Sequence, residues 1–116
     1  MSVSTLRVAI ALLTIATAGI HLALVPPQGM PGGLMFLLNG LGYLALLAAL
    51  WVRPAFLAGR ETLVHYAFMA FTAVTIVAYF AVNGADSFNN PVGLADKVIE
   101  LALIAALWQH LRLSAK

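Results

Sequence analysis

Four long apolar stretches, separated by short connections, constrain the fold of this 116-residue chain more than any other feature. They cover residues 6–25, 34–52, 63–82 and 94–111. A helix needs about 20 residues to cross a hydrocarbon core of about 30 Å. Only 9% of the residues are charged, whereas a water-soluble domain has roughly a quarter of its residues charged. The sequence therefore predicts an all-α fold: one integral membrane domain, 1–116, with four transmembrane helices in an up-down-up-down bundle.

The connections between the apolar stretches indicate how the chain is oriented in a membrane. Residues 26–33 contain no charge, and residues 83–93 contain a single acid, Asp86. Apart from Lys97, the basic residues lie near the two ends or between the second and third stretches: Arg7, Arg53, Arg60, Arg112 and Lys116. Cytoplasmic loops carry an excess of Lys and Arg, so this distribution predicts a multi-pass protein of the cell membrane with both termini cytoplasmic. The first stretch also resembles the core of a secretory signal peptide, but it is longer than such cores usually are.

One hydrogen-bonding side chain on each stretch falls at a similar depth in the predicted membrane. Counted at 1.5 Å per residue, these side chains lie about 5 to 9 Å inside the outer boundary. They are His21, Asn39, Tyr79 and Glu100. Because polar groups that face lipid are costly, we expect the four to turn toward one another and form a polar pocket in the outer half of the bundle.

The fourth stretch places its two acids on one helical face. Asp96 and Glu100 are four residues apart and therefore share that face. The face continues with Leu103, Leu107 and His110. Glu100 is too deep to reach water, so its expected partners are His21, Asn39 as a donor, and Lys97 on its own helix. Asp96 and Lys97 are shallower, and we expect them to reach the outer headgroup region and close the mouth of the pocket.

Further polar and small residues follow the same helical spacing. Polar neighbours lie on the stripes already described: Thr14 and Thr17 with His21, Tyr43 with Asn39, and His65, Thr72 and Thr75 with Tyr79. Small residues, including Gly19, Gly40 and Gly42, are expected to let neighbouring helices pack closely.

Two interpretations of the polar layer stay open. One is structural, since interhelical hydrogen bonds of about 0.6 to 2 kcal/mol each fix the register of helices in a membrane. The other is a site that binds a ligand or handles protons, the default hypothesis for an ionisable residue inside a membrane. The chain has no nucleophile elbow and no Gly-rich phosphate loop, so an enzyme is not favoured. The scattered basic residues form no patch for nucleic acid.

His65 and His110 lie near the predicted cytoplasmic boundary on adjoining stretches. Two histidines that face each other across a four-helix bundle can be the axial ligands of a b-type haem, and the protein would then be an electron carrier. Near the end of a span, a histidine can also simply reach water. No metal site is expected elsewhere, because the chain has no cysteine and His21 with Glu100 supplies only two good ligands.

Three segments carry motifs that can be compared with known families: GIHLALVPP (19–27), GLMFLLNGLGYLALLAALW (33–51) and ADKVIELALIAALWQHL (95–111). They resemble a family of small prokaryotic four-span membrane proteins of unknown function, common in halophilic archaea. That family has a Gly-Ile-His-Leu motif in its first helix, which falls here on His21. Its Asp-Lys-x-x-Glu motif falls on Asp96, Lys97 and Glu100. The resemblance implies these signature positions and no activity. The chain also resembles DoxX-type four-helix membrane proteins, but Asn39 stands where those have an acid.

The expected function follows from the polar layer and the short loops. Loops this short leave no soluble domain, so we expect a ligand- or lipid-binding protein, holding a small ligand, a lipid or a quinone head, or an accessory subunit of a membrane complex. The first alternative is a proton-coupled small-solute transporter that acts as a homodimer. Small multidrug transporters have this size and number of spans, but their intramembrane glutamate is in the first helix, where this chain has His21. The haem electron carrier is the second alternative.

Overall fold

Long helices account for most of the computed structural model, which describes residues 2–114. The four long helices are α1 (Val3–Ala23), α3 (Leu34–Val52), α4 (Glu61–Asn83) and α5 (Pro91–Ser114). Short helical segments lie in the connections: α2 (Val25–Gln28), η1 (Ala55–Leu57) and η2 (Gly84–Asn89). The described residues include no strand. The predicted all-α fold is therefore confirmed.

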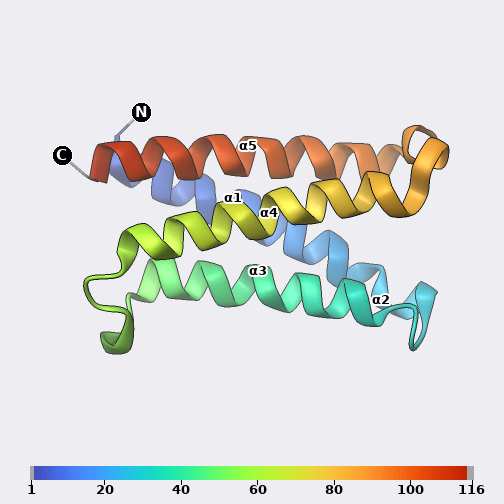
Figure 1. Ribbon diagram of the computed structural model, residues 1–116, viewed down its shortest axis with the longest axis horizontal. Helices are drawn as coiled ribbons and strands as arrows, with labels where there is room; N and C mark the ends of the chain where they lie inside the picture. The colour runs from blue at the N-terminus through green and yellow to red at the C-terminus, as the bar shows by residue number, and fades with distance from the viewer. Residues whose placement is uncertain (1, 115–116) are drawn as a thin grey trace.

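The four long helices form a bundle in which successive helices run in opposite directions (Figure 1). α1 packs against α3 and α5, and α4 packs mainly against α5 and less closely against α3. The chain ends and the connection 53–60 lie together at what we call the terminal end, and the connections 24–33 and 84–90 lie at the far end (Figure 1). Lys116, which contributed to the predicted orientation, lies outside the described residues.

Three of the helices begin before their predicted ranges, and polar side chains cap two of them. Ser2 precedes α1, and its side-chain oxygen accepts a hydrogen bond of 3.1 Å from the Thr5 backbone N–H. Asn90 does the same for α5 by accepting from the Gly93 N–H at 3.0 Å, with Pro91 as the first helical residue. α4 begins at Glu61, an acid that suits the positive end of the helix dipole. α3 covers the same residues as its predicted range.

The first connection is shorter than the sequence predicts. We expected the prolines at 26 and 27 to end the helix, but α2 continues as a helical turn to Gln28. Proline is tolerated in the first turn of a helix, where its missing N–H would have no partner. The chain leaves the helical conformation at Gly29, whose φ of 64° favours glycine.

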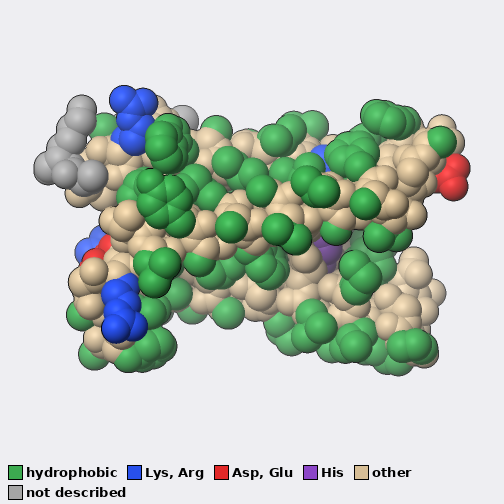
Figure 2. All heavy atoms as spheres, in the orientation of Figure 1, with side chains coloured by type: hydrophobic (Ala, Val, Ile, Leu, Met, Phe, Trp, Pro, Cys, Tyr) green, Lys and Arg blue, Asp and Glu red, His purple; other side chains and the backbone are tan. Residues whose placement is uncertain are grey.

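The outer surface of the bundle is apolar along its length. Figure 2 shows hydrophobic side chains along the visible face, while Lys and Arg side chains gather mainly at the terminal end. Three helical segments are long and apolar enough to cross a membrane: Val3–Gln28, Leu34–Val52 and Glu61–Asn89. α5 is long enough, but it carries four charged residues, namely Asp96, Lys97, Glu100 and Arg112. The helices are thus consistent with a membrane protein.

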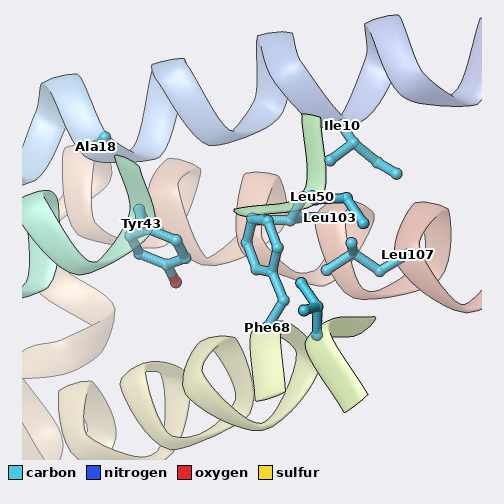
Figure 3. Packing of buried hydrophobic residues seen from close by; sticks show 8 residues of the cluster. Ile10, Ala18, Tyr43, Leu50, Phe68, Leu103 and Leu107 are labelled. Carbon is cyan, nitrogen blue, oxygen red and sulfur yellow. The ribbon is translucent and has the colours of Figure 1, made fainter. Parts of the chain in front are cut away.

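An apolar layer fills the middle of the bundle. Phe68 on α4 and Leu103 and Leu107 on α5 are completely buried, together with Ile10 on α1 (Figure 3). On α5 this layer separates Glu100, toward the far end, from His110, toward the terminal end. The polar residues of the bundle are therefore divided into two groups with apolar packing between them.

Two of the three glycines expected in helix packing do lie at close contacts. A Cβ on Gly40 would meet the Leu22 side chain at 2.7 Å, and one on Gly42 would meet the Phe71 ring at 2.6 Å. A Cβ on Gly19 would meet nothing within 4 Å. The expectation for Gly19 was therefore wrong, because no neighbouring helix approaches α1 at that residue.

Candidate functional site

The charged residues of α5 are buried inside the bundle, toward its far end. Asp96, Lys97 and Glu100 have relative exposures of 3%, 5% and 0%. Lys97 Nζ lies 3.2 Å from Asp96 Oδ2, and it donates a hydrogen bond to Glu100 Oε1. One ammonium group therefore bridges two carboxylates. A buried ionic group needs such pairing, because its desolvation costs several kcal/mol.

Helix α1 supplies two side chains to Asp96. The Thr17 hydroxyl donates a hydrogen bond of 2.6 Å to Asp96 Oδ1, and His21 Nε2 lies 3.7 Å from Asp96 Oδ2. Thr17 and His21 are four residues apart, so they lie on the same face of α1. Asp96 is thus held from α1 and from Lys97 at once.

Helix α3 supplies the partner of Glu100. The Tyr43 hydroxyl donates a hydrogen bond of 2.5 Å to Glu100 Oε2. The ring of Tyr43 is completely buried and packs edge-on against Phe71, with ring centroids 4.9 Å apart. Both oxygens of Glu100 are therefore occupied, one by Lys97 and the other by Tyr43. We refer to Thr17, His21, Tyr43, Asp96, Lys97 and Glu100 as the buried charge cluster.

The proton positions on His21 follow from its neighbours. His21 Nδ1 lies 2.8 Å from the backbone oxygen of Thr17, which can only accept, so Nδ1 carries a proton. Nε2 is the remaining nitrogen and faces Asp96 Oδ2. With neutral His21, two carboxylates and one ammonium leave one uncompensated negative charge in the cluster. One proton, either on His21 Nε2 or on an oxygen of Asp96, would neutralise it.

Four predicted site residues belong to the buried charge cluster, though with different partners. His21, Asp96, Lys97 and Glu100 lie together, as their helical faces indicated. Asp96 and Lys97 do not reach outward, and that expectation was wrong. The reason is that the Lys97 side chain turns inward and donates to Glu100 on the same helix. Its Nζ also lies 5.0 Å from the centroid of the Tyr79 ring.

The side-chain polar groups of the other two predicted residues make their hydrogen bonds outside the cluster. Asn39 was expected to donate to Glu100, but its Nδ2 donates to Thr75 Oγ1 on α4 at 2.9 Å. The Tyr79 hydroxyl donates to the backbone oxygen of Ser87 at 2.6 Å, so it anchors η2 rather than a pocket. Asn39 faces Thr75 on α4, and Tyr79 faces Ser87 at the far end. Each residue therefore hydrogen-bonds to a polar group other than Glu100.

Sequence reasoning did not assign Tyr43 and Thr17 to the site. Both had been placed on the right stripes, since Tyr43 follows Asn39 by four residues and Thr17 precedes His21 by four. A hydroxyl one turn from a candidate residue was the signal available for each. Which of two residues one turn apart would meet an acid depends on the axial shift between helices, which spacing alone does not give.

At the terminal end, the side chains of His65 and His110 are hydrogen-bonded to each other. His65 Nε2 lies 2.7 Å from His110 Nδ1, and the two rings stack with centroids 5.0 Å apart. The two axial nitrogens on opposite sides of a haem iron stand about 4 Å apart, twice a bond of about 2.0 Å. The pair in this arrangement therefore does not fit axial ligation of a haem iron. Neither ring reaches water, since each is only 3% exposed, so the interfacial interpretation was also wrong.

The buried charge cluster contains the residue types of a metal site. One ligand atom each from His21, Asp96 and Glu100 lies within 4.8 Å of the others. Asp96 is the third ligand that sequence reasoning did not count. Lys97 Nζ, however, contacts a carboxylate oxygen of both acids. The ammonium of the protein itself supplies the cation there, and a metal ion would need Lys97 to move away.

Comparison of the chain with protein-family models, curated proteins and solved structures gave no match. The resemblance to small prokaryotic four-span proteins therefore stays a hypothesis based on three segments. The geometry of the buried charge cluster is the evidence for what the protein does.

Proposed function

We propose that the chain is a four-span protein of the cell membrane, with α1, α3, α4 and α5 as the spans and both termini cytoplasmic. The burial of the α5 charges supports the fourth span, because Asp96, Lys97 and Glu100 turn into the bundle. Between residues 92 and 108 of α5, every exposed side chain is apolar. A helix that faces lipid with this surface and hides its charges meets the requirement for a transmembrane segment.

Single cysteines test this topology, because the natural chain has none. Ala55 lies in η1 at the terminal end and Ala85 in η2 at the far end, and both are exposed. We expect a membrane-impermeant thiol reagent added to intact cells to label Ala85→Cys and to leave Ala55→Cys unlabelled until the cells are opened. Labelling of both or of neither in intact cells would contradict the four-span arrangement.

The function that the geometry supports best is the handling of a proton by the buried charge cluster. The observation that carries it is that two buried carboxylates share one Lys ammonium, with His21 Nε2 at 3.7 Å from Asp96. One buried negative charge is left without a partner unless a proton joins the cluster. Since an uncompensated buried charge costs several kcal/mol, the cluster takes up one proton when nothing else neutralises it. Intramembrane acids paired with histidine are typical of proton relays.

The same charge balance favours coupling of the proton to a cationic solute. A proton and a monovalent cation neutralise the same charge, so only one of them occupies the cluster at a time. Such mutually exclusive binding is the basis of exchange. The completely buried Phe68, Leu103 and Leu107 close the cluster from the terminal end, so protons do not leak through this state. Four helices enclose no route of their own, and the carrier acts as a dimer.

A ligand pocket or an accessory-subunit role for the same layer has less support. The oxygens of Glu100 are taken up by Lys97 and Tyr43, and those of Asp96 by Thr17 and Lys97. A neutral ligand head would have to displace these internal partners without supplying the positive charge that the cluster lacks, which a proton or a cation supplies.

Proteoliposomes with a pH-sensitive dye inside test the proposed exchange. The purified chain is reconstituted with an inward-acidic gradient, and Na⁺, K⁺ or tetramethylammonium is added outside. Quaternary ammonium ions cannot cross as neutral bases, so they do not dissipate the gradient by themselves. We expect one of these cations to drive proton efflux and Asp96→Asn to abolish it. Asp86→Asn, the same change at an exposed acid, is the matched control. No cation-driven efflux in the natural protein would contradict the exchange.

A further inference from the structure

A cavity of about 430 Å³ lies at the terminal end of the bundle, away from the buried charge cluster. Its walls come from α3, α4 and α5 and from the connection 53–60. Ligand pockets typically measure about 300 to 1,000 Å³. The polar lining includes Arg53, Glu61, His65 and His110, and Leu50 and Leu57 are among the apolar residues. This is the composition of a site for an amphiphilic ligand.

The hydrogen bonds of the two histidines determine which nitrogen of His110, a residue that lines this cavity, is left without a partner. His65 Nδ1 lies 2.7 Å from the backbone oxygen of Glu61, so it carries a proton and donates. In the neutral pair, His65 Nε2 then accepts from His110 Nδ1 at 2.7 Å. His110 Nε2 is left with a free lone pair. It is buried and has no hydrogen-bond partner within residues 2–114. This nitrogen can therefore accept a hydrogen bond from a donor such as a hydroxyl group.

Arg53 places a positive charge on the same cavity. It ends α3 with a φ of 56°, and the chain turns there into the connection that forms one wall. Across the described part of the chain, Arg53 takes part in no ion pair within 4.0 Å. Glu61 lines the cavity from the first turn of α4 and offers carboxylate oxygens to further hydroxyls. One region of the lining thus suits an anion and another suits hydroxyl donors.

We propose that this cavity binds a phosphate ester that carries free hydroxyls, with the phosphate on Arg53 and a hydroxyl donating to His110 Nε2. A glycerol-phosphate headgroup of an anionic phospholipid has this chemistry, and so does free glycerol phosphate. The apolar residues Leu50, Leu57 and Val64 beside the polar groups suit the glycerol backbone and acyl chains of the lipid. Basic pockets between membrane helices are known to hold anionic headgroups on the cytoplasmic side. The inference goes beyond the proposed proton site and does not depend on it.

Native mass spectrometry of the full chain in detergent tests the proposal. The protein is titrated with short-chain phosphatidylglycerol, phosphatidylcholine or glycerol 3-phosphate, and the bound fraction is measured. We expect phosphatidylglycerol to bind at least about tenfold more tightly than phosphatidylcholine, because the choline headgroup keeps the phosphate but has no hydroxyl for His110 Nε2 and brings a positive charge near Arg53. Binding of glycerol 3-phosphate without a preference among the lipids would assign the same site to a soluble ester.

Two arginines of the same connection provide a matched comparison. Arg53→Gln removes the charge that lines the cavity, and Arg60→Gln removes an exposed charge that does not line it. We expect Arg53→Gln, but not Arg60→Gln, to weaken binding of phosphatidylglycerol and glycerol 3-phosphate, and His110→Phe, which removes the acceptor, to abolish the preference for phosphatidylglycerol. Equal losses in the two arginine variants, or equal binding of both phospholipids without any binding of glycerol 3-phosphate, would overturn the proposal. Asp96→Asn is expected to bind phosphatidylglycerol unchanged, so failure of the proton site is distinguishable.

Discussion

The hydroxyl of Tyr43 on α3 lies 2.5 Å from Glu100 Oε2 on α5 and donates a hydrogen bond to it. This bond joins two helices that are not consecutive in the chain. It provides a partner for Glu100 Oε2, because Lys97 contacts the other oxygen of Glu100. Tyr43→Phe keeps the ring and removes the donor. A hydrogen bond to a buried charged group is worth about 1.5 to 3 kcal/mol, so we expect a loss of that size in the free energy of unfolding.

Unfolding in mixed micelles titrated with dodecyl sulfate measures this loss. Tyr66→Phe is the control, since Tyr66 lies on α4 with half of its surface exposed. Surface substitutions usually change stability by less than about 0.5 kcal/mol. Similar effects of the two substitutions would mean that the bond to Glu100 contributes little.

Lys97 is expected to be the most sensitive residue of the buried charge cluster. Lys97→Met removes the only ammonium between Asp96 and Glu100 and leaves two buried carboxylates facing each other. Removing one partner of a buried ion pair costs about 3 to 5 kcal/mol. We expect the double variant Lys97→Met, Glu100→Gln to recover much of that loss, because one of the stranded charges is then absent. A double variant no more stable than Lys97→Met would show that the charge balance is not what matters.

Two buried threonines on α1 separate a role in the cluster from a role in the helix. Thr17 donates across the bundle to Asp96 at 2.6 Å, whereas Thr14 donates to the Ile10 backbone within α1 at 2.6 Å. Both are completely buried. We expect Thr17→Val to cost about 1 to 3 kcal/mol, because it leaves a buried carboxylate oxygen unpaired. Thr14→Val removes only a bond within the helix, so the same unfolding assay should register a smaller change.

Helix packing gives an expectation that is independent of charge. Gly40 on α3 faces Leu22 so closely that a Cβ would lie 2.7 Å from its side chain, while Gly19 on α1 has open space. Overpacking costs about 1 to 3 kcal/mol, so Gly40→Ala should destabilise the protein. Gly19→Ala should be neutral or stabilising, by up to about 1 kcal/mol, since alanine is the better helix former. A destabilisation at Gly19 as large as that at Gly40 would contradict the observed contact between α1 and α3.

The fold could be predicted because the constraint from composition is strong. Long apolar runs separated by Pro-, Gly- and Asn-rich connections leave few alternatives to a helical bundle, and α3 was located to the residue. The starts of α1 and α5 were predicted three residues too late, because Ser2 and Asn90 act as caps outside the apolar runs. Capping extends a helix into polar sequence, which a search for apolar stretches does not reach.

The site could be predicted only in part, because helical spacing determines which residues share a face of a helix but not which residues of other helices they contact. The shared face of Asp96 and Glu100 follows from their separation of four residues, and both lie in the cluster. The preference of Glu100 for Tyr43 over Asn39 depends on the axial shift between α3 and α5. Whether Lys97 turns inward or outward depends on its side-chain rotamer, which helical spacing does not determine. The ion pair with Glu100 holds the inward rotamer.

The protonation of His21 is the quantity on which the proposed proton site depends. ¹⁵N NMR of protein labelled at histidine, in nanodiscs between about pH 5 and about pH 9, follows both ring nitrogens. We expect Nδ1 to stay protonated throughout, because it donates to Thr17 O, and the signal of Nε2 to differ between the natural protein and Asp96→Asn. An Nε2 signal that is identical in the two proteins across this range would contradict the proposal that His21 and Asp96 handle the same proton.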